Sequence, residues 1–334
     1  MCRSAFGLAA AALLTAACGG GGDVTRPSGT TPPPPATGTN TVAGLVFYDQ
    51  NGNGTVEADE RVRLPGVRIA IGSQAGPTDA SGRFSIGGLP DGPQPLVIQA
   101  DSLPPYFQPG RLPTVSLPLA AGTVVAVPVS LPIGTNHPNV FLAFGDSITE
   151  GTGSDRRRGW ATPLEEKLRA YWGDAEVIVD GIRASRSVDG IQRLPASLAA
   201  SRPAFTLVLY GTNDWNRCQT LAPETCFTVA ALRDMIRTAR SAGSQPVVGT
   251  IIPANPASSL THPDRNRWIQ LENDLIRPMV QQEGAVLAET WGAFGSDPNL
   301  WPPLFFDQNH PDDAGYARIS DAFFQALTRA RGAR

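Results

Sequence analysis

The spacing of apolar residues changes near residue 135 and divides the chain into two regions. Between residues 41 and 132, short runs of alternating or β-branched residues are separated by Gly and Pro turns. No helical period is maintained there over a useful length. This pattern predicts roughly six or seven short strands, folded as a small antiparallel β-sandwich.

Beyond a Gly/Pro/Asn linker at residues 133–139, strand-like runs alternate with amphipathic helical ones as far as residue 331. The pattern predicts five buried strands in a parallel sheet with helices on both faces, a three-layer α/β/α fold. Ligands of such folds bind at the carboxyl ends of the strands. The polar motifs at 145–147, 180–181 and 211–214 follow three of these strands. The strands are expected within 139–146, 175–181, 205–214, 245–253 and 285–294, and the helices within 159–172, 188–201, 228–243, 265–284 and 311–329.

The first 17 residues read as a targeting segment. Arg3 precedes an apolar stretch that is too short to span a bilayer but has the length of a signal-peptide core. The stretch ends in "LLTAAC", which resembles the lipobox of bacterial lipoproteins and makes Cys18 the expected lipidated residue. Thr15 is less usual at the first lipobox position, so cleavage by an ordinary signal peptidase is the alternative. Residues 18–40 are rich in Gly and Pro and are expected to be a tether.

The composition and the signal together predict a protein outside the cytoplasm, anchored to a bacterial membrane through Cys18. A formal net charge of −3 and a pI near 5.7 give no basis for binding nucleic acid. We expect a monomer.

Cys2 would leave with the signal peptide, and Cys218 and Cys226 flank a polar loop. Outside the cytoplasm such a pair indicates a disulfide, with two reduced thiols as the alternative.

A calcium-loop pattern, D-x-[DN]-x-[DN]-G-x5-E, occupies residues 49–60 within the predicted sandwich. The surrounding run resembles the B-type repeats of bacterial surface proteins, and this resemblance implies a β-sandwich with a calcium-binding loop. The loop follows a strand and precedes Pro65, so a helix–loop–helix unit is not expected. A polar hairpin without metal is the alternative. The expected ligands of a structural Ca²⁺ are Asp49, Asn51, Asn53, Thr55 and Glu60.

The second region carries the residues needed for serine chemistry. It has no G-x-x-x-x-G-K-[ST] loop, no zinc-ligand His pair and no G-x-S-x-G elbow. A nucleophilic hydroxyl needs a base, and the base needs an orienting acid. Ser147 follows the first strand of the region, and Asp307-x-x-His310 can place a carboxylate beside an imidazole. His137 and His262 are interpreted as surface or turn residues. Taken separately, the motifs around Ser147 and His310 are also ordinary ways to start a turn or a helix.

A developing oxyanion needs hydrogen-bond donors. The N–H of Ser147, the backbone at Gly181 and the side-chain amide of Asn213 are candidates, because each follows a strand of the predicted sheet. Gly181 and Asn213 are, taken alone, more often turn residues.

Four blocks together resemble the SGNH, or GDSL-type, hydrolases: "FGDSITEG", "VDGIRASRSVDGI", "GTND" and "DQNHP", in family order from Val140 onward. The resemblance implies a flavodoxin-like sheet and ester hydrolysis with Ser147 as nucleophile, His310 as base and Asp307 as orienting acid, and no catalytic cofactor. It also implies Ser147, Gly181 and Asn213 as the oxyanion hole. The second block departs from the family at Val179, Arg183 and Ala184, which puts the shape of the substrate pocket in doubt.

The expected substrates are small-molecule or polysaccharide esters, with O-acetylated carbohydrates favoured over lipids. A lipid-directed esterase and a catalytically inactive surface binding protein are the alternatives. Trp215, the loop between Cys218 and Cys226, Trp301 and the Phe305-Phe306 pair either wall a pocket or pack in the core.

Overall fold

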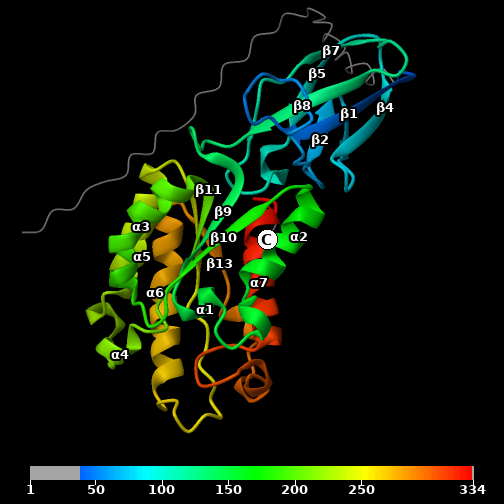
Figure 1. The fold of residues 1–334 in the computed structure, drawn as a ribbon. Coiled ribbons are helices and arrows are strands. Elements are labelled where there is room, and N and C mark those ends of the chain that lie inside the picture. The colour runs from blue at the N-terminus through cyan, green and yellow to red at the C-terminus, as the bar shows by residue number, and fades with distance from the viewer. Residues whose placement is uncertain (1–37, 333–334) are drawn as a thin grey trace, which may run out of the picture. The chain divides into compact units, whose positions relative to one another are not determined.

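A computed structural model describes residues 38–332 (Figure 1). The expected signal peptide, Cys18 and the tether up to residue 37 lie outside the described residues. Within residues 38–332, no helix is both long enough and apolar enough to cross a bilayer.

The first region folds into two four-stranded sheets, with strand orders β4-β1-β8-β6 and β3-β2-β5-β7. Apolar side chains alternate along the strands, so each sheet turns one face to a shared core, as in Arg83–Leu89, where Phe84, Ile86 and Leu89 are buried. The strands are β1 (Asn40–Tyr48), β2 (Arg68–Ile71), β3 (Gln74–Pro77), β4 (Arg83–Leu89), β5 (Gly92–Ile98), β6 (Gln108–Pro109), β7 (Thr114–Leu117) and β8 (Val124–Ser130).

The predicted sandwich is confirmed, with one parallel pair inside it. β1 pairs antiparallel with β4 but parallel with β8, from Ala43 opposite Val124 to Tyr48 opposite Val129. The remaining strand pairs between residues 40 and 130 are antiparallel. The first and last strands of the sandwich therefore run in the same direction.

The second region is a five-stranded, all-parallel sheet, as predicted. Its strand order is β10-β9-β11-β12-β13. Central strand β11 is buried along its whole length, which explains its continuous apolar run. The strands are β9 (His137–Gly145), β10 (Glu176–Gly181), β11 (Pro203–Leu209), β12 (Gln245–Gly249) and β13 (Val286–Ala288), and the long helices are α2 (Ala161–Trp172), α3 (Ser187–Ser201), α5 (Thr228–Ser241), α6 (Arg265–Gln282) and α7 (Asp313–Thr328).

Helices cover both faces of this sheet. Figure 1 shows α3, α5 and α6 on one side and α2 and α7 on the other. Leu194, Leu232 and Ile276 belong to the core of the first side. Trp160 stacks on Phe323 on the second side, with ring centroids 4.4 Å apart. The sheet is thus buried on both faces, and its exposed ends are where side chains remain accessible.

Short helices fill the connections, and two of them follow strands at the carboxyl edge. α1 (Ser147–Glu150) follows β9, and α4 (Trp215–Cys218) comes shortly after β11. The 3₁₀ turns are η1 (Ala100–Ser102), η2 (Asp155–Arg157), η3 (Pro223–Thr225), η4 (Gly292–Phe294), η5 (Pro298–Leu300) and η6 (Pro302–Leu304).

The sandwich packs against the amino-terminal ends of the parallel strands. The hydroxyl of Tyr106 donates to the carbonyl of Pro246 in β12 (2.6 Å) and accepts from the N–H of Val286 in β13 (3.1 Å). The N–H of Arg63 donates to the carbonyl of Trp172 at the end of α2. These contacts leave the carboxyl edge of the sheet free of the sandwich.

Candidate active site

Ser147 lies at a strand-to-helix turn at the carboxyl end of β9. Asp146 caps α1, because its carboxylate accepts from the N–H of Ile148 at 2.9 Å. A Cβ on Gly145 would lie 2.1 Å from the Thr149 hydroxyl and 2.5 Å from the Leu209 carbonyl. Only glycine fits this position, so the chain can turn sharply and present the hydroxyl of Ser147 at the edge of the sheet.

The structure brings Ser147, His310 and Asp307 into one hydrogen-bonded line. Ser147 Oγ lies 2.9 Å from His310 Nε2, and His310 Nδ1 lies 2.7 Å from Asp307 Oδ2. The second oxygen of Asp307 accepts from the N–H groups of Asn309 and His310, both at 2.8 Å. The turn therefore fixes the carboxylate, and the carboxylate fixes the ring. This arrangement can activate a hydroxyl for nucleophilic attack.

Asp307 is held in its ionised form. Burial alone would raise its pKa, but the two backbone N–H groups and the imidazole together outweigh burial and lower the pKa below the usual value. An ionised Asp307 keeps the Nδ1–H of the imidazole directed toward itself. Nε2 is then free to accept the proton of Ser147.

The three expected oxyanion donors lie at the carboxyl ends of three adjacent strands: Gly181 ends β10, Ser147 opens α1 after β9, and Asn213 follows β11. Gly181 sits opposite Gly145 in the parallel register, and a Cβ there would lie 2.3 Å from the N–H of Glu150. The amide of Asn213 donates to the carbonyl of Ser185 at 3.0 Å and to the carboxylate of Asp146 at 3.3 Å. These positions gather at one end of the sheet, beside Ser147.

The loop after Gly181 shows how the departures from the family pattern are accommodated. Ala184 has a φ of 57°, a left-handed conformation that glycine adopts without strain. Arg183 pairs with Glu150 of α1 at 2.6 Å. Val179 lies in the edge strand β10 and is 48 % exposed. The backbone conformation that suits glycine is therefore kept, while the side chains around it differ.

Two arginines near the site, Arg193 (partly buried) and Arg265 (buried), were not identified from the sequence. Arg193 of α3 pairs with Asp180 and donates to the carbonyls of Gly145 (2.7 Å) and Asp180 (2.9 Å) and to the hydroxyl of Tyr210 (2.8 Å). It thereby joins the carboxyl ends of β9, β10 and β11. Arg265 is 5 % exposed and donates to the carbonyl of Thr212, next to Asn213.

Asp146 is a buried acid directly beside the nucleophile. Burial raises its pKa to about 7, and the charge of Asp214 adds to this, while the N–H of Ile148 and the charge of Arg265 oppose it. From the sequence, the position of Asp146 before a helix predicts only that it caps the amino terminus of that helix. Its burial, and its contact with Asn213, depend on the packing of distant segments.

The other candidate side chains separate into core and surface. Trp215, Trp301 and Phe305 are buried and pack in the core, whereas Phe306 is 67 % exposed beside Asp307. His137 is exposed at the start of β9. His262 accepts from the N–H of Asp264 in a turn. These two histidines do not contact the Ser147 line.

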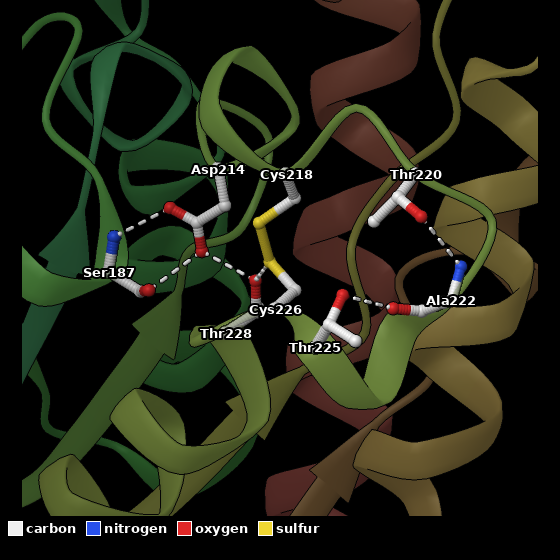
Figure 2. Close-up of a disulfide and its surroundings, with 8 residues drawn as sticks. All are labelled: Ser187, Asp214, Cys218, Thr220, Ala222, Thr225, Cys226 and Thr228. Atoms are coloured by element: carbon white, nitrogen blue, oxygen red, sulfur yellow. Dashed lines mark hydrogen bonds between the residues drawn. A yellow bond between two sulfur atoms is a disulfide. The ribbon is translucent and has the colours of Figure 1, made fainter.

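Cys218 and Cys226 form the expected disulfide. Figure 2 shows it beside Asp214 and Thr228, between α4 and α5. Cys226 Sγ lies 3.2 Å from the hydroxyl of Thr228.

The loop at residues 49–60 closes on itself through its two end carboxylates. Asp49 accepts from the N–H of Gly54 at 2.8 Å, and Glu60 accepts from the N–H of Gln50 at 2.8 Å. Both acids are buried. Within residues 38–332 no group of three His, Cys, Asp or Glu side chains is placed to hold a metal. Cation binding would therefore need these two carboxylates together with the neutral oxygens of Asn51, Asn53 and Thr55, a donor set that suits Ca²⁺.

The model of the GDSL-like Lipase/Acylhydrolase family matches residues 143–318, more than half of the chain. Esterase TesA of Pseudomonas aeruginosa is 37 % identical over 73 residues, which are 22 % of this chain and 36 % of TesA. The chain thus matches about a third of the length of this relative.

Solved structures with a similar fold include a putative lipolytic protein of the G-D-S-L family from Desulfitobacterium hafniense. It is 18 % identical, with a TM-score of 0.47, and the match covers 57 % of this chain and 99 % of that one. A catalytic mutant of the acetylxylan esterase Axe2 from Geobacillus stearothermophilus is 18 % identical, with a TM-score of 0.48 and coverages of 57 % and 95 %.

Proposed function

The chain belongs to the GDSL-like lipase/acylhydrolase family, and on this basis we propose that it is a serine esterase that cleaves carboxylic esters through an acyl-enzyme on Ser147. The observation that carries the proposal is the continuous hydrogen-bonded line from Ser147 Oγ through His310 to Asp307, at 2.9 and 2.7 Å. A structural turn would not need an imidazole aimed at a serine hydroxyl across 163 residues of sequence.

In the first half-reaction, His310 Nε2 takes the proton of Ser147 as Oγ attacks the ester carbonyl. The tetrahedral oxyanion accepts hydrogen bonds from the N–H groups of Ser147 and Gly181 and from the amide of Asn213. The weaker bond from Asn213 to Asp146, at 3.3 Å, is the one that the oxyanion replaces. His310 then gives its proton to the leaving alcohol. In the second half-reaction water attacks the acyl-enzyme by the same steps and releases the carboxylic acid.

Replacing the nucleophile tests the mechanism. Ser147→Ala should abolish hydrolysis of p-nitrophenyl acetate while the circular dichroism spectrum and the melting temperature stay close to those of the parent. Ser201→Ala is a matched control, because that hydroxyl bonds only within α3, to the carbonyl of Ser197. Activity of Ser147→Ala near that of the control would exclude Ser147 as the nucleophile.

Removing one oxyanion donor gives a second, graded test. Asn213→Ala should lower kcat by roughly 10²–10³-fold with little change in KM, because the donor acts mainly on the transition state. A change in KM alone would place Asn213 in substrate binding instead.

For the substrate we propose short acyl esters such as O-acetylated carbohydrates, supported by the resemblance of the sandwich to modules of bacterial surface proteins. A lipid-directed esterase is the second candidate, favoured by apolar side chains at the site: Phe306 is 67 % exposed and Ile182 is 49 % exposed. A series of acyl-chain lengths, assayed together with acetylated oligosaccharides, separates the two. A rise of kcat/KM with chain length would favour the lipid candidate.

An inactive binding protein is the remaining alternative. Labelling of the folded protein by a fluorophosphonate, lost in Ser147→Ala, would exclude it.

We further propose that the enzyme works outside the cytoplasm, held at a membrane by a lipid on Cys18. The disulfide between Cys218 and Cys226 supports an oxidising compartment. Metabolic labelling with a radioactive fatty acid, compared between the parent and Cys18→Ser, tests the anchor. Equal labelling of the two would exclude lipidation at Cys18.

A further inference from the structure

The disulfide closes a small ring directly behind the oxyanion residue Asn213. The carbonyl of Asp214 accepts from the N–H of Cys218 at 3.0 Å, and Cys218 is bonded to Cys226. Cys226 Sγ lies 3.2 Å from the hydroxyl of Thr228, which donates to the carboxylate of Asp214 at 2.8 Å. Figure 2 shows the disulfide and the bond from Thr228 to Asp214, the residue that follows Asn213 in the chain.

Asp214 also joins this ring to the loop that follows Gly181, another of the proposed oxyanion donors. Asp214 is fully buried. Its carboxylate accepts hydrogen bonds from the backbone N–H of Ser187 (2.9 Å) and from the Ser187 hydroxyl (2.7 Å). Asn213 donates to the carbonyl of Ser185 at 3.0 Å. The loop after Gly181 and the loop around Asn213 are therefore fastened together at two neighbouring points.

The disulfide is the covalent support of this arrangement, beside the hydrogen bonds of Asp214 with Ser187 and of Asn213 with Ser185. Between α4 and α5 the chain forms only the 3₁₀ turn Pro223–Thr225 and joins no sheet. Without the covalent bond, the chain between α4 and α5 would be held to Asp214 by hydrogen bonds alone, such as that from the Thr228 hydroxyl. An oxyanion donor is effective only near 2.7–3.1 Å from the developing charge, so small displacements of Asn213 reduce catalysis.

We propose that the disulfide between Cys218 and Cys226 is a positioning element of the oxyanion hole, acting on Asn213 through Thr228 and Asp214. The proposal rests on the esterase function proposed above. It assigns the disulfide a role in transition-state stabilisation in addition to the general stability that closing a short loop gives.

Two threonines of the same segment provide a matched pair of variants. Thr228→Val removes the hydroxyl that bonds Asp214 and keeps the side-chain volume. Thr225→Val removes a hydroxyl that bonds the carbonyl of Ala222 and does not contact Asp214. We expect Thr228→Val to lower kcat by about tenfold with KM unchanged. Thr225→Val should leave both constants unchanged, and Thr228→Ser, which keeps the hydroxyl, should restore kcat.

A double-mutant cycle separates positioning from general stability. Cys218→Ser/Cys226→Ser should lower kcat in the parent, measured well below the melting temperature, where the variant is fully folded. In the Asn213→Ala background the same change should have almost no further effect, because the group that it positions is gone. If the two losses multiply, the disulfide does not act through Asn213 and the proposal is overturned. The same holds if Thr228→Val and Thr225→Val behave alike.

The parent and Ser147→Ala distinguish the two levels of failure. A parent without esterase activity would overturn both the proposed function and this inference. An active parent with an inactive Ser147→Ala, together with independent losses in the cycle, would overturn only the inference.

Discussion

Ala184 is a strained residue in the loop that follows Gly181, the proposed oxyanion glycine. Its φ of 57° is costly for a side chain with a Cβ, by roughly 1–2 kcal/mol, and glycine relieves this at a smaller cost in chain entropy. Ala184→Gly should therefore raise the free energy of unfolding by up to about 1 kcal/mol in urea denaturation. A destabilised variant would show that the methyl group makes contacts that outweigh the strain.

Glu272 gives the fold a dependence on pH. Its side chain is fully buried in α6, and burial, followed by the charge of Asp214, raises the pKa to about 8. In the unfolded chain a Glu titrates near 4.3, so between these values unfolding releases a proton. The stability of the parent should fall as the pH rises from about 4.5 to 8.

Glu272→Gln replaces the titrating carboxyl group with a neutral amide. The variant should equal the parent in stability near pH 4.5 and exceed it above pH 8 by up to about 5 kcal/mol, measured by denaturation across the pH range. A constant difference between the two proteins at all pH values would contradict the role of Glu272.

The sequence predicts the proposed catalytic residues better than the residues that support them. Asp307 and His310 are predictable because one short turn holds both, and Ser147 because it follows an apolar strand. Arg193 and Arg265 could not be predicted as supporting residues, because an arginine on an amphipathic helix usually faces solvent. Their burial depends on contacts with strands that are distant in sequence, such as that of Arg193 with Gly145.

At the scale of elements, helix α3 does more than cover the sheet. Through Arg193 it ties the ends of three strands, and the guanidinium lies 3.9 Å from the ring centroid of Phe144. Arg193→Met should lower the free energy of unfolding by about 3 kcal/mol, because it removes the cation that pairs with Asp180 and a donor to two carbonyls. Arg158→Met, which breaks the exposed pair with Glu166, is the control and should change little. Equal effects would show that Arg193 is no more important than a surface arginine.

Most elements could be predicted from the apolar pattern, whereas one pairing could not. The five parallel strands and their helices each carry a continuous or amphipathic apolar run, so their positions and their order along the chain follow from the sequence. The parallel pairing of β1 with β8 joins segments about 80 residues apart. Nothing local in either strand specifies its partner or its direction.

At the scale of the whole molecule, we expect the sandwich to respond to Ca²⁺. Millimolar Ca²⁺ should raise the melting temperature of the full chain, and a chelator should reverse this. The gain at 100 times the dissociation constant is about 2.7 kcal/mol. Glu60→Gln should remove the response. Asp79→Asn should keep it, since Asp79 caps another turn of the sandwich, where it accepts from Ser81 and Arg83. If Ca²⁺ leaves the melting temperature of the parent unchanged, the calcium site is excluded.

The parallel pairing of β1 and β8 has a mechanical consequence. Because the two strands run in the same direction, the chain enters the sandwich at Asn40 and leaves it at Ser130 at opposite ends, about 30 Å apart for a nine-residue strand. A force that pulls on residue 40 against the catalytic region therefore acts along the strands. It loads the six residue pairs from Ala43 to Tyr48 together, in shear, whereas an antiparallel pair would open one bond at a time. This pairing is therefore expected to resist extension of the sandwich.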